Sequence, residues 1–197
     1  MLNLADPSGF TLFILISVMV SVAAVPILLS VVQTPPIEEV ERVTMRHLWY
    51  RTKVGVIAII MSQFVSSIVF SMGAVYVTRL GFAAYEVANF MGALMAGGMF
   101  LQWPLGKLSD SIDRRWVMGF SCLLGVFIAI FISFIDEASV WLYGLVFLFG
   151  GCALSLYSIV VAFTNDHLRP TEIVPASGTI ILVSGLASVT GPIAVVY

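Results

Sequence analysis

The ten residues GKLSDSIDRR, at positions 106–115, form a charged island in an otherwise apolar chain. Five of them are charged, and about twenty uncharged residues lie on either side. Of the 197 residues, 60% are hydrophobic and only 10% are charged. Because soluble domains carry roughly 25% charged residues, the composition predicts a membrane protein whose loops hold most of the charges.

Six charge-free stretches are long enough to cross a bilayer as helices, which takes roughly 20 apolar residues. Backbone polar groups in lipid must be satisfied within the segment, so continuous apolar runs indicate helices, whereas strands of a barrel would alternate polar and apolar residues. The helices predicted from these stretches are 10–32, 54–78, 84–105, 115–135, 139–163 and 173–196, with Glu86 and Arg115 at the starts of the third and fourth. We therefore expect an all-α membrane protein with six transmembrane helices and no soluble domain.

The basic residues predict the orientation of these helices, because Lys and Arg accumulate in cytoplasmic loops. One set of loops carries Arg79 alone. The other set carries Arg42, Arg46, Arg51, Lys53, Lys107, Arg114, Arg115 and Arg169. We expect this second, basic end to face the cytoplasm and both chain ends to face outward.

The connection 34–53 is the only long one between predicted spans. Its residues IEEVERVTMRHLWYR mix apolar and charged side chains, which is typical of an amphipathic helix at the membrane interface, with Trp49 and Tyr50 at headgroup level. A long linker often separates two helical bundles. We expect 1–33 to hold the last helix of one bundle, 34–53 to be a cytoplasmic linker, and 54–197 to hold five helices of the next bundle.

The charged stretch resembles the signature loop of the major facilitator superfamily, G-x-L-[AS]-D-[RK]-x-G-R-[RK]. Ser111 and Asp113 depart from that pattern, and the missing basic residue at 111 puts one cytoplasmic salt bridge of the family in doubt. The neighbouring QWPL (102–105) and the later NDHL (165–168) look like a bacterial subgroup of these transporters. The positions that match in register are Gly106, Leu108, Ser109, Asp110, Arg114 and Arg115.

The resemblance implies a partial helical bundle, covering the sixth to eleventh helices of a twelve-helix transporter. In that family the matched loop acts as a conformational latch that holds the cytoplasmic side shut. Gly106 would allow close helix packing, and Asp110 would lie at the N-terminal end of the helix that starts near 171, where an anion is favoured. Arg114, followed by Arg115, would pair with a carboxylate at the end of another helix, for which Asp166 is the candidate.

The function implied by the resemblance is secondary active transport of a small solute by alternating access. The expected location is the bacterial inner membrane, as a multi-pass protein in the lipid bilayer. The expected partners are a solute and the missing N-terminal bundle of the same chain. We expect no cofactor, no metal, no nucleic-acid partner and no enzymatic activity.

A polar face runs along the predicted span 54–78, where Ser62, Gln63, Ser66, Ser67 and Ser71 recur at helical spacing. Such a face either lines a substrate cavity or makes hydrogen bonds between helices. The resemblance favours a cavity lined by Gln63, Ser66 and Ser67, with Tyr157 as a weaker candidate. No Asp, Glu, Lys, Arg or His lies near the middle of any predicted span, so we expect no proton-coupling residue of these types in this piece.

Two other interpretations stay open from the sequence. A six-helix protein acting as a dimer, or a remnant that does not transport, would fit the same apolar pattern. An intramembrane serine hydrolase would need a base within hydrogen-bond reach of its nucleophile. Ser177 is the candidate nucleophile, but both histidines, His47 and His167, precede it in predicted loops.

Overall fold

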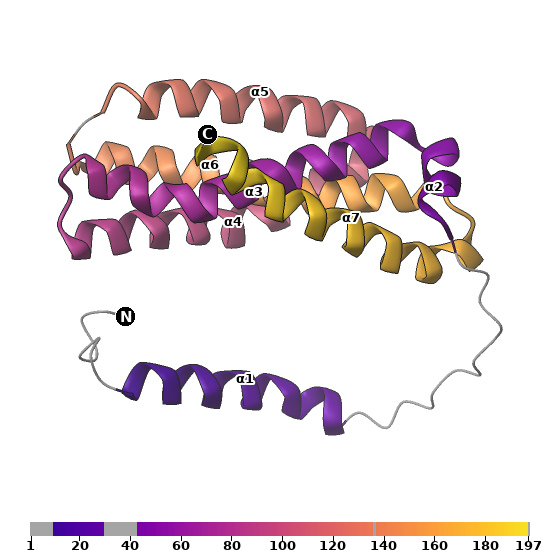
Figure 1. The fold of residues 1–197 in the computed structure, drawn as a ribbon, viewed down its shortest axis with the longest axis horizontal. Helices are drawn as coiled ribbons and strands as arrows, with labels where there is room; N and C mark the ends of the chain where they lie inside the picture. Colours follow the sequence, from indigo (N-terminus) through magenta and orange to yellow (C-terminus); the bar gives the residue numbers. More distant parts are fainter. Residues whose placement is uncertain (1–9, 30–42, 136, 197) are drawn as a thin grey trace. The chain divides into compact units, whose positions relative to one another are not determined.

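A computed structural model describes residues 10–29, 43–135 and 137–196 of the chain. The described residues form helices joined by short turns, with no strand among them (Figure 1). The chain divides into two compact units, 1–39 and 40–197. The helices are α1 (Thr11–Leu29) in the first unit and, in the second, α2 (Met45–Arg51), α3 (Lys53–Arg79), α4 (Ala84–Ser111), α5 (Arg114–Ile132), α6 (Val140–Asn165) and α7 (Pro170–Val196).

Four of the six predicted spans, α3, α5, α6 and α7, are long and apolar enough to cross a membrane by length and composition. α4 has 28 residues but does not meet the same standard, because polar residues such as Glu86, Asn89 and Gln102 interrupt its apolar sequence. In α1 the apolar helix Phe13–Pro26 is shorter than a membrane-spanning helix must be. The chain is a helical, multi-pass membrane protein, with four clear spans in its described part.

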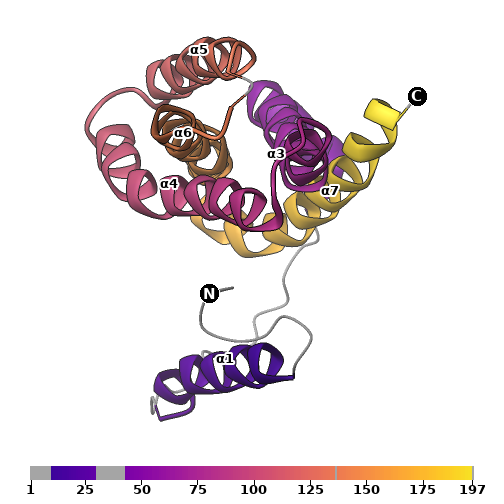
Figure 2. The ribbon, with the colours of Figure 1, turned by 90° about the vertical axis from the view of Figure 1, so that its left-hand side faces the viewer.

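The helices of the second unit pack around α6. α6 packs against α4, α5 and α3, and α7 packs against α3 (Figure 2). Consistent with this central place, α6 has the largest buried share among the four spans. The arrangement leaves α5 at the outside, with its outer face free to meet lipid.

Apolar side chains on the outer face of α5 are strongly exposed, as the lipid-facing side of a membrane helix should be. Leu123 is 63% exposed and Phe127 is 60% exposed. On the inner face, Val117, Met118 and Ile128 are buried. Contiguous exposed apolar surface of this kind is rare on soluble monomers, and its position on a span-length helix identifies it as surface that lipid covers.

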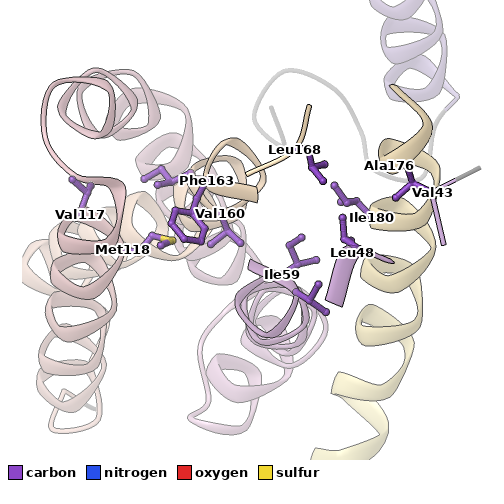
Figure 3. Packing of buried hydrophobic residues seen from close by; sticks show 12 residues of the cluster. Val43, Leu48, Ile59, Val117, Met118, Val160, Phe163, Leu168, Ala176 and Ile180 are labelled. Atoms are coloured by element: carbon purple, nitrogen blue, oxygen red, sulfur yellow. The ribbon is translucent and has the colours of Figure 1, made fainter. Parts of the chain in front are cut away.

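Two buried clusters hold the second unit together. One lies toward the basic end and includes Leu48, Ile59, Met118, Val160 and Phe163; Figure 3 shows Met118 beside Phe163. The other lies toward the opposite end and comprises Val77, Phe90, Leu94, Leu142 and Val146. Because the linker residue Leu48 belongs to the first cluster, helix α2 is packed into the bundle.

α3 ends in a turn that glycine makes possible. Gly81 has φ +88°, in the left-handed region that residues with a side chain rarely adopt. Its N–H donates to the Thr78 carbonyl at 3.1 Å, and the Phe82 N–H donates to the Val77 carbonyl at 3.2 Å. These two bonds form the Schellman arrangement, which satisfies the last carbonyls of a helix and lets α4 return beside α3.

α4 continues beyond the predicted end of its span at 105. It passes through Pro104 and ends at Ser111, so most of the charged stretch lies in the last turns of a helix. The actual turn is Ile112–Asp113. Asp113 starts α5, where its Oδ1 accepts a hydrogen bond from the Arg115 N–H at 3.0 Å. The expectation of a loop over 106–114, between two predicted spans, was therefore wrong for all but Ile112 and Asp113.

Candidate functional site

Arg114 forms the centre of an ion cluster at the basic end of the bundle. Its Nη2 lies 2.9 Å from Asp110 Oδ1, at the end of α4, and its Nε lies 2.7 Å from Asp166 Oδ2, directly after α6. Nη1 also donates to Ser109 Oγ at 3.4 Å. With its side chain only 22% exposed, one guanidinium at the start of α5 joins the ends of three helices.

The cluster needs Arg in particular, because its planar fork presents several N–H donors in fixed directions. Asp110 is one helical turn before Arg114 in the chain, so the short turn at 112–113 brings them together without help from other elements. Asp166 caps the C-terminal end of α6. The pairing of Arg114 with Asp166, anticipated from the resemblance, is thus present in the structure.

The structure places Asp110 differently from the expectation. Asp110 faces Arg114, and the carboxylate at the start of α7 is Glu172, whose Oε2 accepts the Arg169 N–H at 3.0 Å. Glu172 therefore supplies the anion that the N-terminal end of α7 favours. The physical reason is that Asp110 has a cation one turn away, while α7 carries its own capping carboxylate.

Gly106 was expected to allow a neighbouring helix to approach, but no helix in the described part of the chain does so. A Cβ placed at Gly106 would meet no atom within 4 Å. Arg115 lies at the edge of the cluster, with its guanidinium carbon 5.4 Å from the centre of the Phe163 ring. This is a cation–π contact between α5 and α6.

A cavity of about 600 Å³ opens beside the ion cluster. It lies between the end of α4, the start of α5 and the end of α6. Polar and charged groups dominate its wall, so it suits water and ions better than an apolar solute. The lining residues are Ser109, Asp110, Ile112, Asp113, Arg114, Arg115, Phe163, Asp166 and His167.

A second ion cluster, which sequence reasoning missed, joins the linker helix α2 to α7. Glu172 Oε1 lies 3.1 Å from His47 Nε2 and 3.6 Å from Arg51 Nη2. Beside it, the Thr179 hydroxyl donates to the Val43 carbonyl at 2.5 Å. One sequence feature pointed to this cluster: an acidic residue begins a predicted span, and the linker at the same end is basic. The sequence alone could not pair them, because His47 and Glu172 are 125 residues apart.

The four predicted cavity residues do not converge on the charged cavity. Ser66 is buried, and its hydroxyl has no hydrogen-bond partner among the described residues. The Ser67 hydroxyl donates to the Phe64 carbonyl at 2.9 Å and lies where α3 meets Gly191 of α7. Gln63 is half-buried.

Tyr157, the fourth predicted cavity residue, joins α6 to α7. Its hydroxyl oxygen accepts a hydrogen bond from the Ser184 hydroxyl at 3.4 Å. Of the polar face of α3, Ser67 is the residue whose side chain the structure places against α7.

The candidate nucleophile Ser177 is engaged within its own helix. The Ser177 hydroxyl donates to the Ile173 carbonyl of its own helix at 2.9 Å. Among the residues that the structure describes, no three His, Cys, Asp or Glu side chains gather to hold a metal ion.

Comparisons with known proteins agree with this geometry. The sequence model of the Major Facilitator Superfamily matches residues 4–192. Similar curated proteins include the "Uncharacterized MFS-type transporter YcaD" of Salmonella arizonae, Salmonella paratyphi B and Salmonella newport, each 23% identical over 142 residues. No solved structure matches the chain.

The match to these relatives takes in 72% of this chain but only 36% of each relative, so the chain spans about a third of their length. The family match, in contrast, extends over nearly the whole chain. With the ion cluster of the signature loop in place at one end of a bundle of apolar helices, the chain belongs to the Major Facilitator Superfamily of membrane transporters.

Proposed function

We propose that the chain forms part of a secondary active transporter that moves a small solute across the bacterial inner membrane by alternating access. The observation that carries this proposal is the three-helix junction at Arg114, in which Arg114 and Asp110 match the signature loop and Asp166 comes from the end of α6. A group that ties α4, α5 and α6 together at one end can hold these helices in one arrangement and release them in another.

The strength of the Arg114 contacts suits a latch that must open. Asp110 and Asp166 are 67% and 52% exposed, and exposed ion pairs contribute about 0–1 kcal/mol each. Alternating access requires two states that differ by only a few kcal/mol. Contacts of this strength can bias such an equilibrium without locking it.

The proposed architecture assigns 1–33 to the last helix of an N-terminal bundle, 34–53 to the cytoplasmic linker and 54–197 to the C-terminal bundle. In this superfamily, substrate sites lie near the bilayer midplane between two bundles. The polar face of α3, with Gln63, Ser66 and Ser67, is our candidate for the contribution of this bundle, and Tyr157 is a weaker one.

Direct transport measurements test the proposal. The full-length protein is purified, and a panel of sugars, amino acids, organic acids and cationic drugs is screened for solutes that raise its thermal unfolding temperature, since a ligand stabilises the state it binds. Stabilising solutes are then offered to liposomes that contain the protein. We expect saturable uptake that competes with unlabelled solute; uptake that rises linearly with concentration would contradict a carrier.

A further inference from the structure

A second cavity, of about 550 Å³, lies on the outer face of the linker helix α2. Its lining consists of Met45, Arg46, Trp49 and Tyr50 from α2 and Lys53 from the start of α3. Two cations and two aromatic rings thus share one surface, and none of the described lining residues is a carboxylate.

Helical geometry explains why these residues share a face. Residues four apart lie one above the other along a helix, which aligns Met45 with Trp49 and Arg46 with Tyr50. The Arg46 guanidinium carbon lies 5.8 Å from the centre of the Tyr50 ring. This cation–π contact holds the cation over the surface, while Tyr50 is 70% exposed.

The opposite face of α2 is fixed to the bundle. Leu48 is only 1% exposed and packs in the core cluster of the basic end. His47 and Arg51 contact Glu172 of α7, and the Thr52 N–H closes the helix on the Leu48 carbonyl at 2.9 Å. The outer face therefore has a defined direction, away from α7.

The position of α2 places this face at the membrane surface. α2 leads directly into α3 and packs against it, and it contacts the first turn of α7 (Figure 1). Both α3 and α7 are long and apolar enough to cross a membrane. A short helix at their ends lies at the level of the lipid headgroups, where Trp and Tyr side chains are favoured.

We propose that the outer face of α2, together with Lys53, binds the phosphate of an anionic lipid headgroup. Arg46 offers a planar fork that matches phosphate oxygens, and Lys53 supplies a second positive charge. Trp49, Tyr50 and Met45 provide apolar surface for the glycerol and upper acyl region of the lipid. Free phosphate would use only the cations, so the mixed lining favours a lipid.

The test compares two lipids with the same acyl chains. Full-length protein in detergent is titrated with phosphatidylglycerol or phosphatidylcholine, and bound lipid is counted by native mass spectrometry. We expect the wild type to bind phosphatidylglycerol in preference to phosphatidylcholine. In the double variant Arg46→Gln/Lys53→Gln this preference should be about tenfold smaller, since each basic group near an anionic surface contributes measurably to binding.

Two controls separate a built site from general charge. Lys107→Gln removes another cation at the basic end, one that also lies over an aromatic ring, 5.7 Å from the centre of Trp103. We expect Lys107→Gln to keep the lipid preference. The charge-conserving variant Arg46→Lys/Lys53→Arg should keep most of it, which would show that a loss in the double Gln variant does not come from misfolding after any change at these positions. An unchanged preference in the double Gln variant, an equal loss in Lys107→Gln, or equally tight binding of inorganic phosphate would overturn the proposal.

Discussion

At the scale of single residues, Arg114 and Glu172 define the two ion clusters of the basic end. Arg114 holds two carboxylates, from α4 and from the end of α6. Glu172 reverses the pattern, since one carboxylate on α7 holds two basic residues of the linker helix. Together the clusters connect α2, α4, α5, α6 and α7 at a single end.

Replacing Asp110 by Asn should slow transport while leaving the fold intact. The change removes one charge from Arg114 but keeps a polar group of the same size, so the free energy of unfolding should fall by no more than about 1 kcal/mol. We expect several-fold slower solute uptake in liposomes. Asp113→Asn is the matched control, because Asp113 caps α5 and has no ion pair with Arg114 among the described residues. Equal uptake by the wild type and Asp110→Asn would count against a latch.

Glu172→Gln should loosen the linker helix from α7. The neutral amide loses its attraction for Arg51 and for protonated His47, yet its oxygen still accepts the Arg169 N–H. We expect faster amide hydrogen exchange over residues 45–51 and unchanged exchange in α6. Glu137→Gln, an exposed change near the other end of the bundle, serves as control. Identical exchange in all three proteins would show that the ion pairs do not hold α2.

At the scale of elements, the contact between α4 and α6 depends on glycines placed opposite carbonyl groups. A Cβ at Gly97 would overlap the Phe147 carbonyl oxygen, and one at Gly150 would overlap the Leu94 carbonyl oxygen. The two positions are reciprocal, since each helix presents a glycine to the backbone of the other. Small residues allow such close approach between helices in membranes, where apolar burial gives no driving force.

Gly97→Ala and Gly150→Ala should each destabilise the bundle by about 2 kcal/mol or more, because the added methyl group meets backbone and forces the helices apart. Gly92→Ala and Gly144→Ala are matched controls on the same helices, since a Cβ there would meet no atom within 4 Å. The measurement is the thermal unfolding temperature of the full-length protein in detergent. Similar temperatures for the four variants would contradict this description of the α4–α6 contact.

The sequence predicted the helices better than their contacts. Charge-free runs located all six long helices, because lipid excludes charge from the spans. They did not predict that α4 continues through Pro104 to Ser111, since a charged turn and a charged helix end look alike in sequence. The mixed pattern around Trp49 predicted an amphipathic helix over the region that holds α2, but not its attachment to α7.

Long-range pairs were predictable only where a family pattern supplied them. The Arg114–Asp166 pair followed from the resemblance of the charged stretch, whereas the Glu172 contacts with His47 and Arg51 had no such guide. Among the glycines of α4 and α6, Gly97 and Gly151 lie at close contacts but Gly92 does not. Spacing identifies residues on one face of a helix, and only packing determines which of them meet a neighbour.

At the scale of the whole molecule, charge is concentrated at one end of the second unit. Arg79 lies at the opposite end. The other basic residues that the structure describes lie at or beside the helix ends of the charged side: Arg46, Arg51, Lys53, Lys107, Arg114, Arg115 and Arg169. This asymmetry favours a cytoplasmic basic end. The chain spans about a third of the length of the curated relatives that it matches.

The most direct test of alternating access needs no knowledge of the solute. Gln63→Cys is introduced into the full-length protein with Cys122 and Cys152 replaced by Ser, and a membrane-impermeant maleimide is applied to right-side-out and to inside-out vesicles. Leu123→Cys, on the lipid-facing side of α5, is the control and should stay unlabelled. The account predicts that position 63 reacts from both sides of the membrane, and that adding Asp110→Asn increases its labelling from the basic side. Labelling from one side only, unaffected by Asp110→Asn, would contradict it.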